Sequence, residues 1–112
     1  MSPITTHVLD LVRGRPAAGV AVRLERGDHG GPWIEVGAAA TDANGRTGDL
    51  AATPLEAGHH RLTFETGAYF RAQGIAAFHP RVVVSFDVAD PAQHHHVPLL
   101  VAPFGYSTYR GS

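Results

Sequence analysis

Short segments in which apolar and polar residues alternate recur along this chain, and they constrain its fold more than any other feature. A period of two residues places successive side chains on opposite faces of a strand. Turn-forming residues such as glycine, proline and asparagine separate the segments. The alternation predicts strands at residues 4–12, 20–25, 33–40, 59–66, 81–88, 94–101 and 104–109.

One segment has a helical pattern instead. Tyr69, Phe70 and Gln73 lie at helical spacing, which predicts a short helix over residues 67–74. Several short strands with at most one helix are typical of a β-sandwich. No internal repeat or linker interrupts the pattern, so we expect residues 1–112 to form a single all-β domain. A domain of this size buries roughly 60 to 70% of the surface its unfolded chain exposes, which is enough for a core.

Composition excludes several classes of function. Nine Lys+Arg against ten Asp+Glu give a formal net charge of -1, without a basic run, so a nucleic acid partner is not expected. The absence of cysteine removes disulfides and thiolate nucleophiles. No apolar stretch approaches the ~18 residues of a membrane span, and residues 1–3 lead into the first strand without a signal peptide. A cytoplasmic protein is therefore the expectation.

The charged fraction predicts assembly. Charged residues make up 17% of the chain, against about 25% in an average soluble domain. Less polar surface is left to cover a monomer, so part of the outside is expected to be buried against other copies of the chain.

The histidines near the end of the chain lie on a predicted strand. Alternation places His94 and His96 on one face, and His95, Val97 and Leu99 on the other. Proline and glycine in the turn over residues 102–105 predict a hairpin to the last strand. The two imidazoles therefore lie on one face of the predicted strand, and the apolar side chains lie on the opposite face.

Two further candidates come from the first half of the chain. His7 lies on the first predicted strand, on the face opposite Thr6 and Val8. Arg46 follows Asn44 and Gly45, a pair that favours a positive φ in a tight turn. Without further information, an arginine after such a turn is more often a solvated surface charge.

Three motifs resemble the transthyretin-like 5-hydroxyisourate hydrolases of urate catabolism. They are Thr-His-Val-Leu-Asp at residues 6–10, His-Val-Pro-Leu-Leu at residues 96–100 and Tyr-Arg-Gly-Ser at residues 109–112. The similarity covers nearly the whole chain, and the closing tetrapeptide marks the enzymes and is absent from transthyretin. The resemblance implies an antiparallel β-sandwich of two sheets with one short helix. It also implies a homotetramer, a dimer of dimers with sites in the channel between dimers.

The resemblance further implies an activity and a site. The activity is hydrolysis of 5-hydroxyisourate to 2-oxo-4-hydroxy-4-carboxy-5-ureidoimidazoline, without a metal or other cofactor. The implied catalytic residues are His7, Arg46 and His96. The implied substrate-binding residues are His7, Arg46, Tyr109, Arg110, Gly111 and Ser112. Asn44, His95 and Phe104 depart from the family pattern, and none of these departures removes a proposed catalytic group.

These residue types suit the implied chemistry. A urate-derived ring is flat, polar and readily anionic, so a planar, permanently charged guanidinium such as Arg46 suits it. Ring opening requires a water to lose a proton as it attacks a carbonyl, and a neutral imidazole with a pKa of about 6.5 can accept that proton. We expect one of His7 and His96 to be the general base and the other to orient or protonate, with His7 favoured as the base.

Two other functions remain possible from the sequence. His7, His94 and His96 could form a three-histidine zinc site with an open position, although no carboxylate is placed to orient the imidazoles. The same sandwich could instead be a non-enzymic protein that binds a small hormone-type ligand. Tyr109 would then be a packing or interface aromatic.

Overall fold

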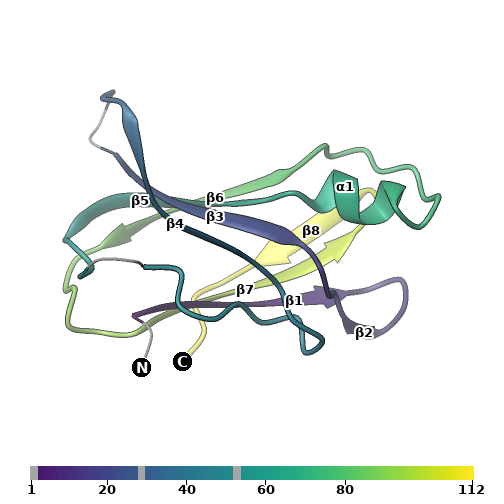
Figure 1. The fold of residues 1–112 in the computed structure, drawn as a ribbon, viewed down its shortest axis with the longest axis horizontal. Coiled ribbons are helices and arrows are strands. Elements are labelled where there is room, and N and C mark those ends of the chain that lie inside the picture. Colours follow the sequence, from purple (N-terminus) through teal and green to yellow (C-terminus); the bar gives the residue numbers. More distant parts are fainter. Residues whose placement is uncertain (1–2, 28–29, 52–53) are drawn as a thin grey trace.

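The computed structural model describes residues 3–27, 30–51 and 54–112. Residues 1–2 at the start, 28–29 in the predicted loop after the second strand, and 52–53 lie outside the described residues. Eight strands and one helix are present in the described ranges (Figure 1). In order they are β1 (Ile4–Asp10), β2 (Arg15–Pro16), β3 (Ala21–Gly27), β4 (Trp33–Ala40), β5 (Gly58–Phe64), α1 (Thr66–Arg71), β6 (Val82–Val88), β7 (His95–Ala102) and β8 (Gly105–Thr108).

The strands form two sheets of four that pack face to face (Figure 1). One sheet has the order β2-β1-β7-β8 and the other β4-β3-β5-β6. All pairs are antiparallel except β1 with β7, which run parallel from Ile4 beside His95 to Asp10 beside Val101. The predicted sandwich is confirmed. The parallel pair brings the first strand of the chain against the strand that carries the later histidines.

The element boundaries differ from the predictions at several places. The first strand ends at Asp10, because its carboxylate accepts hydrogen bonds from the N–H groups of Val12 and Arg13 and turns the chain. Arg15 and Pro16, predicted as part of a turn, form the short strand β2 beside the end of β1. The helix spans Thr66–Arg71, shorter than the predicted 67–74, and a turn leads from it to Gly74, where φ is 74°.

The core lies between the sheets and is built from one face of each strand. Val8, Leu24, Leu62, Phe64 and Leu99 are fully buried. Burial of each such side chain stabilises the fold by about 1.5–3 kcal/mol. Within the described residues, no helix is long and apolar enough to cross a bilayer.

Two histidines also lie in this core. His60 and His95 are buried, and the His60 ring stacks on Phe86 with centroids 5.8 Å apart. Burial lowers the pKa of both imidazoles, because the interior disfavours their charged form. These rings therefore pack as neutral groups.

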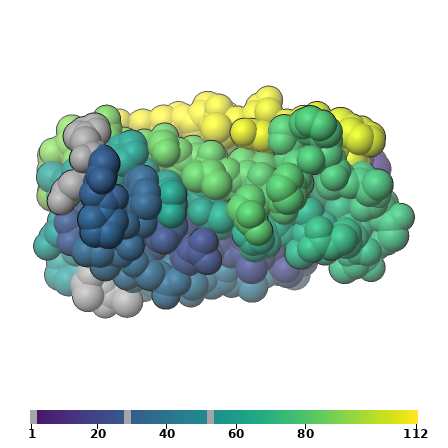
Figure 2. All heavy atoms as spheres, turned by 90° about the horizontal axis from the view of Figure 1, so that it is seen from above, coloured from purple at the N-terminus to yellow at the C-terminus, as the bar shows by residue number. Residues whose placement is uncertain are grey.

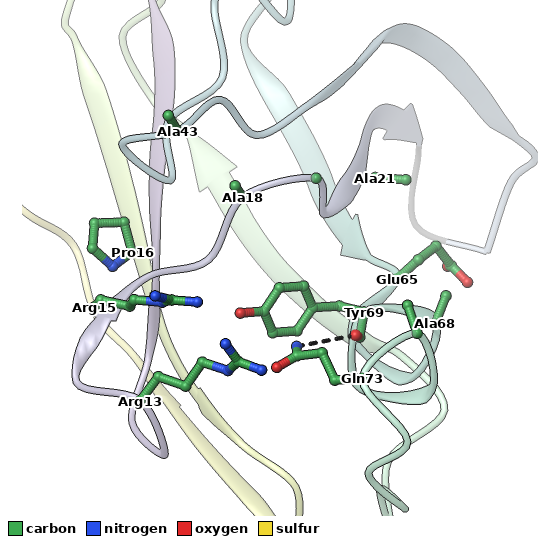
Figure 3. Close-up of a pocket in the computed structure, with 12 residues that line it drawn as sticks. Arg13, Arg15, Pro16, Ala18, Ala21, Ala43, Glu65, Ala68, Tyr69 and Gln73 are labelled. Carbon is green, nitrogen blue, oxygen red and sulfur yellow. Dashed lines mark hydrogen bonds between the residues drawn. The ribbon is translucent and has the colours of Figure 1, made fainter.

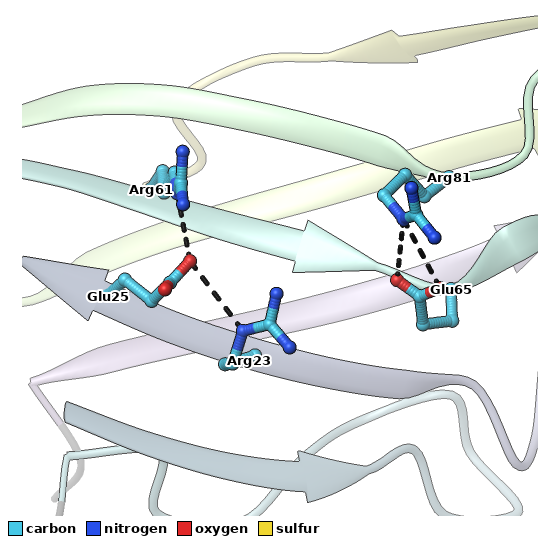
Figure 4. Close-up of polar contacts among 5 residues, drawn as sticks. All are labelled: Arg23, Glu25, Arg61, Glu65 and Arg81. Carbon is cyan, nitrogen blue, oxygen red and sulfur yellow. Dashed lines mark hydrogen bonds and ion pairs between the residues drawn. The ribbon is translucent and has the colours of Figure 1, made fainter. Parts of the chain in front are cut away.

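The outer face of the second sheet carries charged side chains. Glu25 lies between Arg23 and Arg61 (Figure 4). The Arg61 guanidinium also lies 4.1 Å from the centre of the Trp33 ring. The hydrogen bond from Arg61 is the main reason that the pKa of Glu25 is lowered. These pairs belong to β3 and β5, so they lie on the sheet that does not carry His7 and His96.

Candidate active site

His7 lies on the outward face of β1. Thr5, His7 and Leu9 are half-buried on this face, and they alternate with residues that are buried in the core. This alternation is the one predicted from the sequence. His7 therefore faces away from the core, on the sheet with the order β2-β1-β7-β8.

His96 lies on the neighbouring strand β7, directly beside Thr5 in the parallel register. The Thr5 hydroxyl oxygen is 2.8 Å from His96 Nδ1 and 2.8 Å from His94 Nε2. The two imidazoles are thus on one face of the chain at the start of β7, with His94 just before the strand, as predicted, while His95 points into the core. One threonine hydroxyl joins both rings.

Arg46 reaches the same sheet from a tight turn. The Asp42 carboxylate accepts hydrogen bonds from the backbone N–H groups of Arg46 and Asn44, at 3.0 and 2.8 Å, which lower the pKa of Asp42. Gly45 has a φ of 75°, and its carbonyl accepts a 2.8 Å hydrogen bond from the N–H of Val8. Arg46 then pairs with His7 as a bridge partner. The turn therefore holds the backbone of Arg46 beside that of His7.

The end of the chain runs along one edge of the molecule (yellow in Figure 2). Its residues lie in two different environments. Gly111 pairs with His96, and its N–H donates a 2.8 Å hydrogen bond to the His96 carbonyl. Gly111 thereby joins His7, Arg46 and His96, as the sequence implied. Ser112 follows as an exposed residue.

Tyr109 and Arg110 lie elsewhere in the single chain. Both line a hollow of about 230 Å³ next to β6, together with His95 on the core side of β7. Arg110 Nη2 is 3.4 Å from the side-chain oxygen of Gln93. The structure therefore brings Gly111 to the imidazoles, whereas Tyr109 and Arg110 line another surface, where Arg110 Nη2 is also 3.5 Å from the carbonyl oxygen of His94.

The environment of His96 favours its neutral form. Burial contributes most to the lowering of its pKa, followed by the positive charge of Arg46 and the charges of His94 and His7. A neutral imidazole has a nitrogen lone pair that can accept a proton, so this electrostatic setting is compatible with a general base.

Comparisons with known proteins agree with this geometry. The model of the HIUase/Transthyretin family matches residues 4–111. The chain is 47% identical to the 5-hydroxyisourate hydrolase of Caulobacter vibrioides, over 100% of both chains. The chain belongs to the HIUase/Transthyretin family.

Solved structures of this family share the fold. A transthyretin from Sparus aurata superposes with a TM-score of 0.91 at 34% identity and covers 99% of this chain and 97% of its own. The 5-hydroxyisourate hydrolase of Klebsiella pneumoniae superposes with a TM-score of 0.86 at 42% identity, over 100% of both chains. The transthyretin is the better superposition and the hydrolase is the closer sequence of these two. Fold alone therefore does not separate the two branches of the family.

The donor geometry does not favour the zinc alternative. Among the described residues, no group of three or more histidine, cysteine, aspartate or glutamate side chains is arranged to hold a metal ion. His94 Nε2 and His96 Nδ1 both contact the Thr5 hydroxyl, and the two ring centroids are 6.4 Å apart. The ring nitrogens that face each other across Thr5 are therefore both in contact with its hydroxyl group.

A large hollow on the described surface lies away from these residues. It has a volume of about 580 Å³ and lies between the turn after β1 and helix α1, lined by Arg13, Arg15, Tyr69 and Gln73 among others (Figure 3). His7, Arg46 and His96 do not line it. They lie on an open sheet face, which by itself does not enclose a small molecule.

The sequence reasoning missed Thr5 as a site residue. A signal was present, because Thr5 shares the outward face of β1 with His7. What the sequence could not show is the contact with His96, a residue 91 positions later.

Proposed function

We propose that this protein hydrolyses 5-hydroxyisourate to 2-oxo-4-hydroxy-4-carboxy-5-ureidoimidazoline. One observation carries the proposal: the chain is 47% identical over its whole length to a named 5-hydroxyisourate hydrolase, and His7, Arg46, His96 and Gly111 meet on one sheet face. A polar, cationic site of this kind suits a urate-derived ring better than an apolar hormone. The hormone-binding alternative is therefore not favoured.

Arg46 is proposed to bind the substrate and to stabilise charge. Its guanidinium can donate two parallel hydrogen bonds to ring oxygens, and its permanent charge offsets the negative charge that develops on the attacked carbonyl. The turn around Gly45 fixes its backbone beside His7. Tyr109, Arg110 and Ser112 stay in the proposal as substrate-binding residues contributed through the assembled oligomer.

His7 and His96 are proposed to share the acid-base step, one as the general base and the other to orient or protonate. The product carries a new carboxyl group and a terminal ureido group, so the bond broken is a ring amide C–N bond. One imidazole takes a proton from the attacking water, and a proton is delivered to the leaving ring nitrogen. The sequence favoured His7 as the base, but the hydrogen bond at Nδ1 and the lowered pKa of His96 favour His96 instead.

A homotetramer, a dimer of dimers, is proposed to complete the site. The imidazoles lie on an open sheet face, and apolar side chains are exposed nearby at the ends of the strands. They include Leu11 at 54%, Val12 at 57%, Phe78 at 71% and Phe104 at 74%. Exposed apolar groups of this size commonly mark protein interfaces. Light scattering should give four chains per particle, and an active monomer at low micromolar concentration would contradict the proposal.

A direct assay tests the activity. Urate is oxidised enzymatically to generate 5-hydroxyisourate, and its ultraviolet absorbance is followed with and without the protein. Decay should be faster than the spontaneous rate, and His7→Asn and His96→Asn should each lower kcat by about 10²-fold or more while the protein stays folded. Full activity in both variants would rule out the proposed proton transfer.

Two further expectations have simple measurements. Turnover is expected to be insensitive to chelators, and elemental analysis of the purified active protein is expected to find no stoichiometric metal. The cytoplasmic location stays a prediction, which cell fractionation with an antibody against the chain would test.

A further inference from the structure

Thr5 connects two histidines through one hydroxyl group. Its Oγ1 lies 2.8 Å from His96 Nδ1 and 2.8 Å from His94 Nε2. A threonine hydroxyl has one hydrogen to donate and two lone pairs to accept with. A chain of hydrogen bonds through it therefore has a direction: one imidazole donates to Thr5 and the other accepts from it.

The direction decides what His96 can do. If Nδ1 carries the proton and donates it to Thr5, the other ring nitrogen, Nε2, has a free lone pair and can act as a base. If Nδ1 accepts from Thr5, Nε2 carries the proton and cannot take one from water. Because Thr5 occupies Nδ1, Nε2 is the nitrogen left for the site, where the charge of Arg46 acts on the ring. A nearby positive charge favours a ring nitrogen that presents a lone pair over one that presents an N–H group.

The outer end of the chain of hydrogen bonds reaches solvent. His94 lines an open hollow of about 490 Å³ with Pro3, Leu55 and Gln93. Water in such a hollow can hydrate a positive charge on His94. A charge on His96 is disfavoured, because that ring is desolvated and lies near the charges of Arg46, His94 and His7.

We infer that Thr5 and His94 are positioning residues that hold His96 in the Nδ1–H form and carry its proton during turnover. This inference rests on the proposed function for its catalytic part. In this arrangement His96 Nδ1–H donates a hydrogen bond to Thr5 Oγ1, and the Thr5 hydroxyl donates one to His94 Nε2.

The proton movements balance over one turnover. As the water oxygen bonds to the ring carbonyl carbon, its proton passes to His96 Nε2, the Nδ1 proton passes to Thr5 Oγ1, and the Thr5 hydroxyl proton passes to His94 Nε2. His96 is then neutral, with a proton on Nε2 that it gives to the leaving ring nitrogen as the C–N bond breaks. The proton on His94 returns through Thr5 to His96 Nδ1. One water is consumed and no charge stays on His96.

A spectroscopic experiment tests the direction without any substrate. Long-range ¹H–¹⁵N spectra of histidine-labelled protein, at a pH where the rings are neutral, distinguish a protonated ring nitrogen from one with a lone pair. His96 is assigned by its absence in His96→Asn. The expected result is a protonated Nδ1 and an unprotonated Nε2, and the reverse pattern would overturn the inference.

Substitutions at Thr5 test its role. Thr5→Val keeps the shape and removes the hydroxyl, so the Nδ1–H signature should be lost and kcat should fall by about 10²-fold with KM little changed. Thr5→Ser should restore both. The matched control is Thr6→Val on the same strand, whose hydroxyl donates a 2.6 Å hydrogen bond to the Val97 carbonyl and should affect stability only. Wild-type spectra and kcat in Thr5→Val would overturn the inference.

His94→Gln separates the two parts of the role. A glutamine oxygen can accept the Thr5 hydrogen bond but cannot hold the transferred proton. The Nδ1–H signature of His96 should survive while kcat falls, and an unchanged kcat would overturn the proton-carrying part. If the wild-type protein left 5-hydroxyisourate untouched, the proposed function would fail, while the spectra would still decide the form of His96.

Discussion

The N–H of Gly111 donates a 2.8 Å hydrogen bond to the carbonyl oxygen of His96, which ties the end of the chain to the strand that carries a candidate catalytic imidazole. The approach is close, because a Cβ built at residue 111 would lie 2.5 Å from His96 Cδ2. Only glycine fits against the ring at this distance. Gly111 is thus packed against the candidate site, whereas Tyr109, Arg110 and Ser112 are exposed in the single chain.

Gly111→Ala should therefore impair the site and not the fold. The added methyl group would push the His96 ring or the tail aside, and a displacement of about 1 Å can lower turnover by about 10²-fold. Initial rates and thermal unfolding of the variant give the two readouts. Gly105→Ala, on the same hairpin with no atom near its added Cβ, is the control and should retain activity. Equal activity of the two variants would contradict the prediction.

Gly45→Ala should lower both stability and activity. Residue 45 has a φ of 75°, and an added Cβ would collide with the carbonyl oxygen of Val8. Strain of this kind costs about 1–3 kcal/mol, and relief would require the turn to move Arg46 away from His7. Urea unfolding measures the first effect and kcat/KM the second. Gly48→Ala has open space around its Cβ and provides the comparison.

The charge of Arg46 should set part of the pH profile. Burial is the main cause of the lowered pKa of His96 and the Arg46 charge is the next, because both disfavour the imidazolium. Arg46→Gln removes the charge, so the pKa of His96 should rise and the acid limb of the rate profile should move to higher pH. Arg46→Lys keeps the positive charge, so the acid limb should stay in place. Lysine cannot donate the bidentate hydrogen bonds of a guanidinium, so much of kcat/KM should be lost. An unmoved acid limb in Arg46→Gln would contradict this assignment.

His60 should make the fold sensitive to acid. Its Nδ1 lies 2.9 Å from the Gly58 carbonyl, its buried Nε2 has no hydrogen-bond partner in the described structure, and burial lowers its pKa. The neighbouring charges of Arg26, His95 and His59 add to this lowering. As the pH falls below about 6.5, His60 binds a proton in the unfolded chain but stays neutral in the folded protein. The free energy of unfolding therefore falls. Above that pH this stabilisation is fully present.

His60→Phe should flatten this dependence between about pH 7 and pH 5. Urea unfolding across that range, at one fixed protein concentration, measures the slope for each variant. His95 is buried and has a lowered pKa as well, so part of the slope should remain. His79→Gln is the control, because His79 is half-buried in the loop before β6 and is not among the charges that act on His60. A slope in His60→Phe equal to that of the unmutated protein would contradict the prediction.

The sequence by itself determined the elements and the faces. Alternation along residues 4–10 and 94–101 correctly placed His7, His94 and His96 outward and His95 inward, because strand geometry is local and has a period of two. The helix after β5 and the final hairpin also follow from local signals. Family motifs added Arg46 and Gly111, which meet the imidazoles as expected.

Only the tertiary structure decided which faces meet. The parallel pairing of β1 with β7 joins residues 91 positions apart and places Thr5 against His96, and no local pattern records such a pairing. The direction of Tyr109 and Arg110, towards β6 and away from His7, also depends on how the two sheets pack. The physical reason is that hydrogen bonds between distant strands and packing between sheets are set by the whole core, whereas alternation within a strand is set by its own backbone.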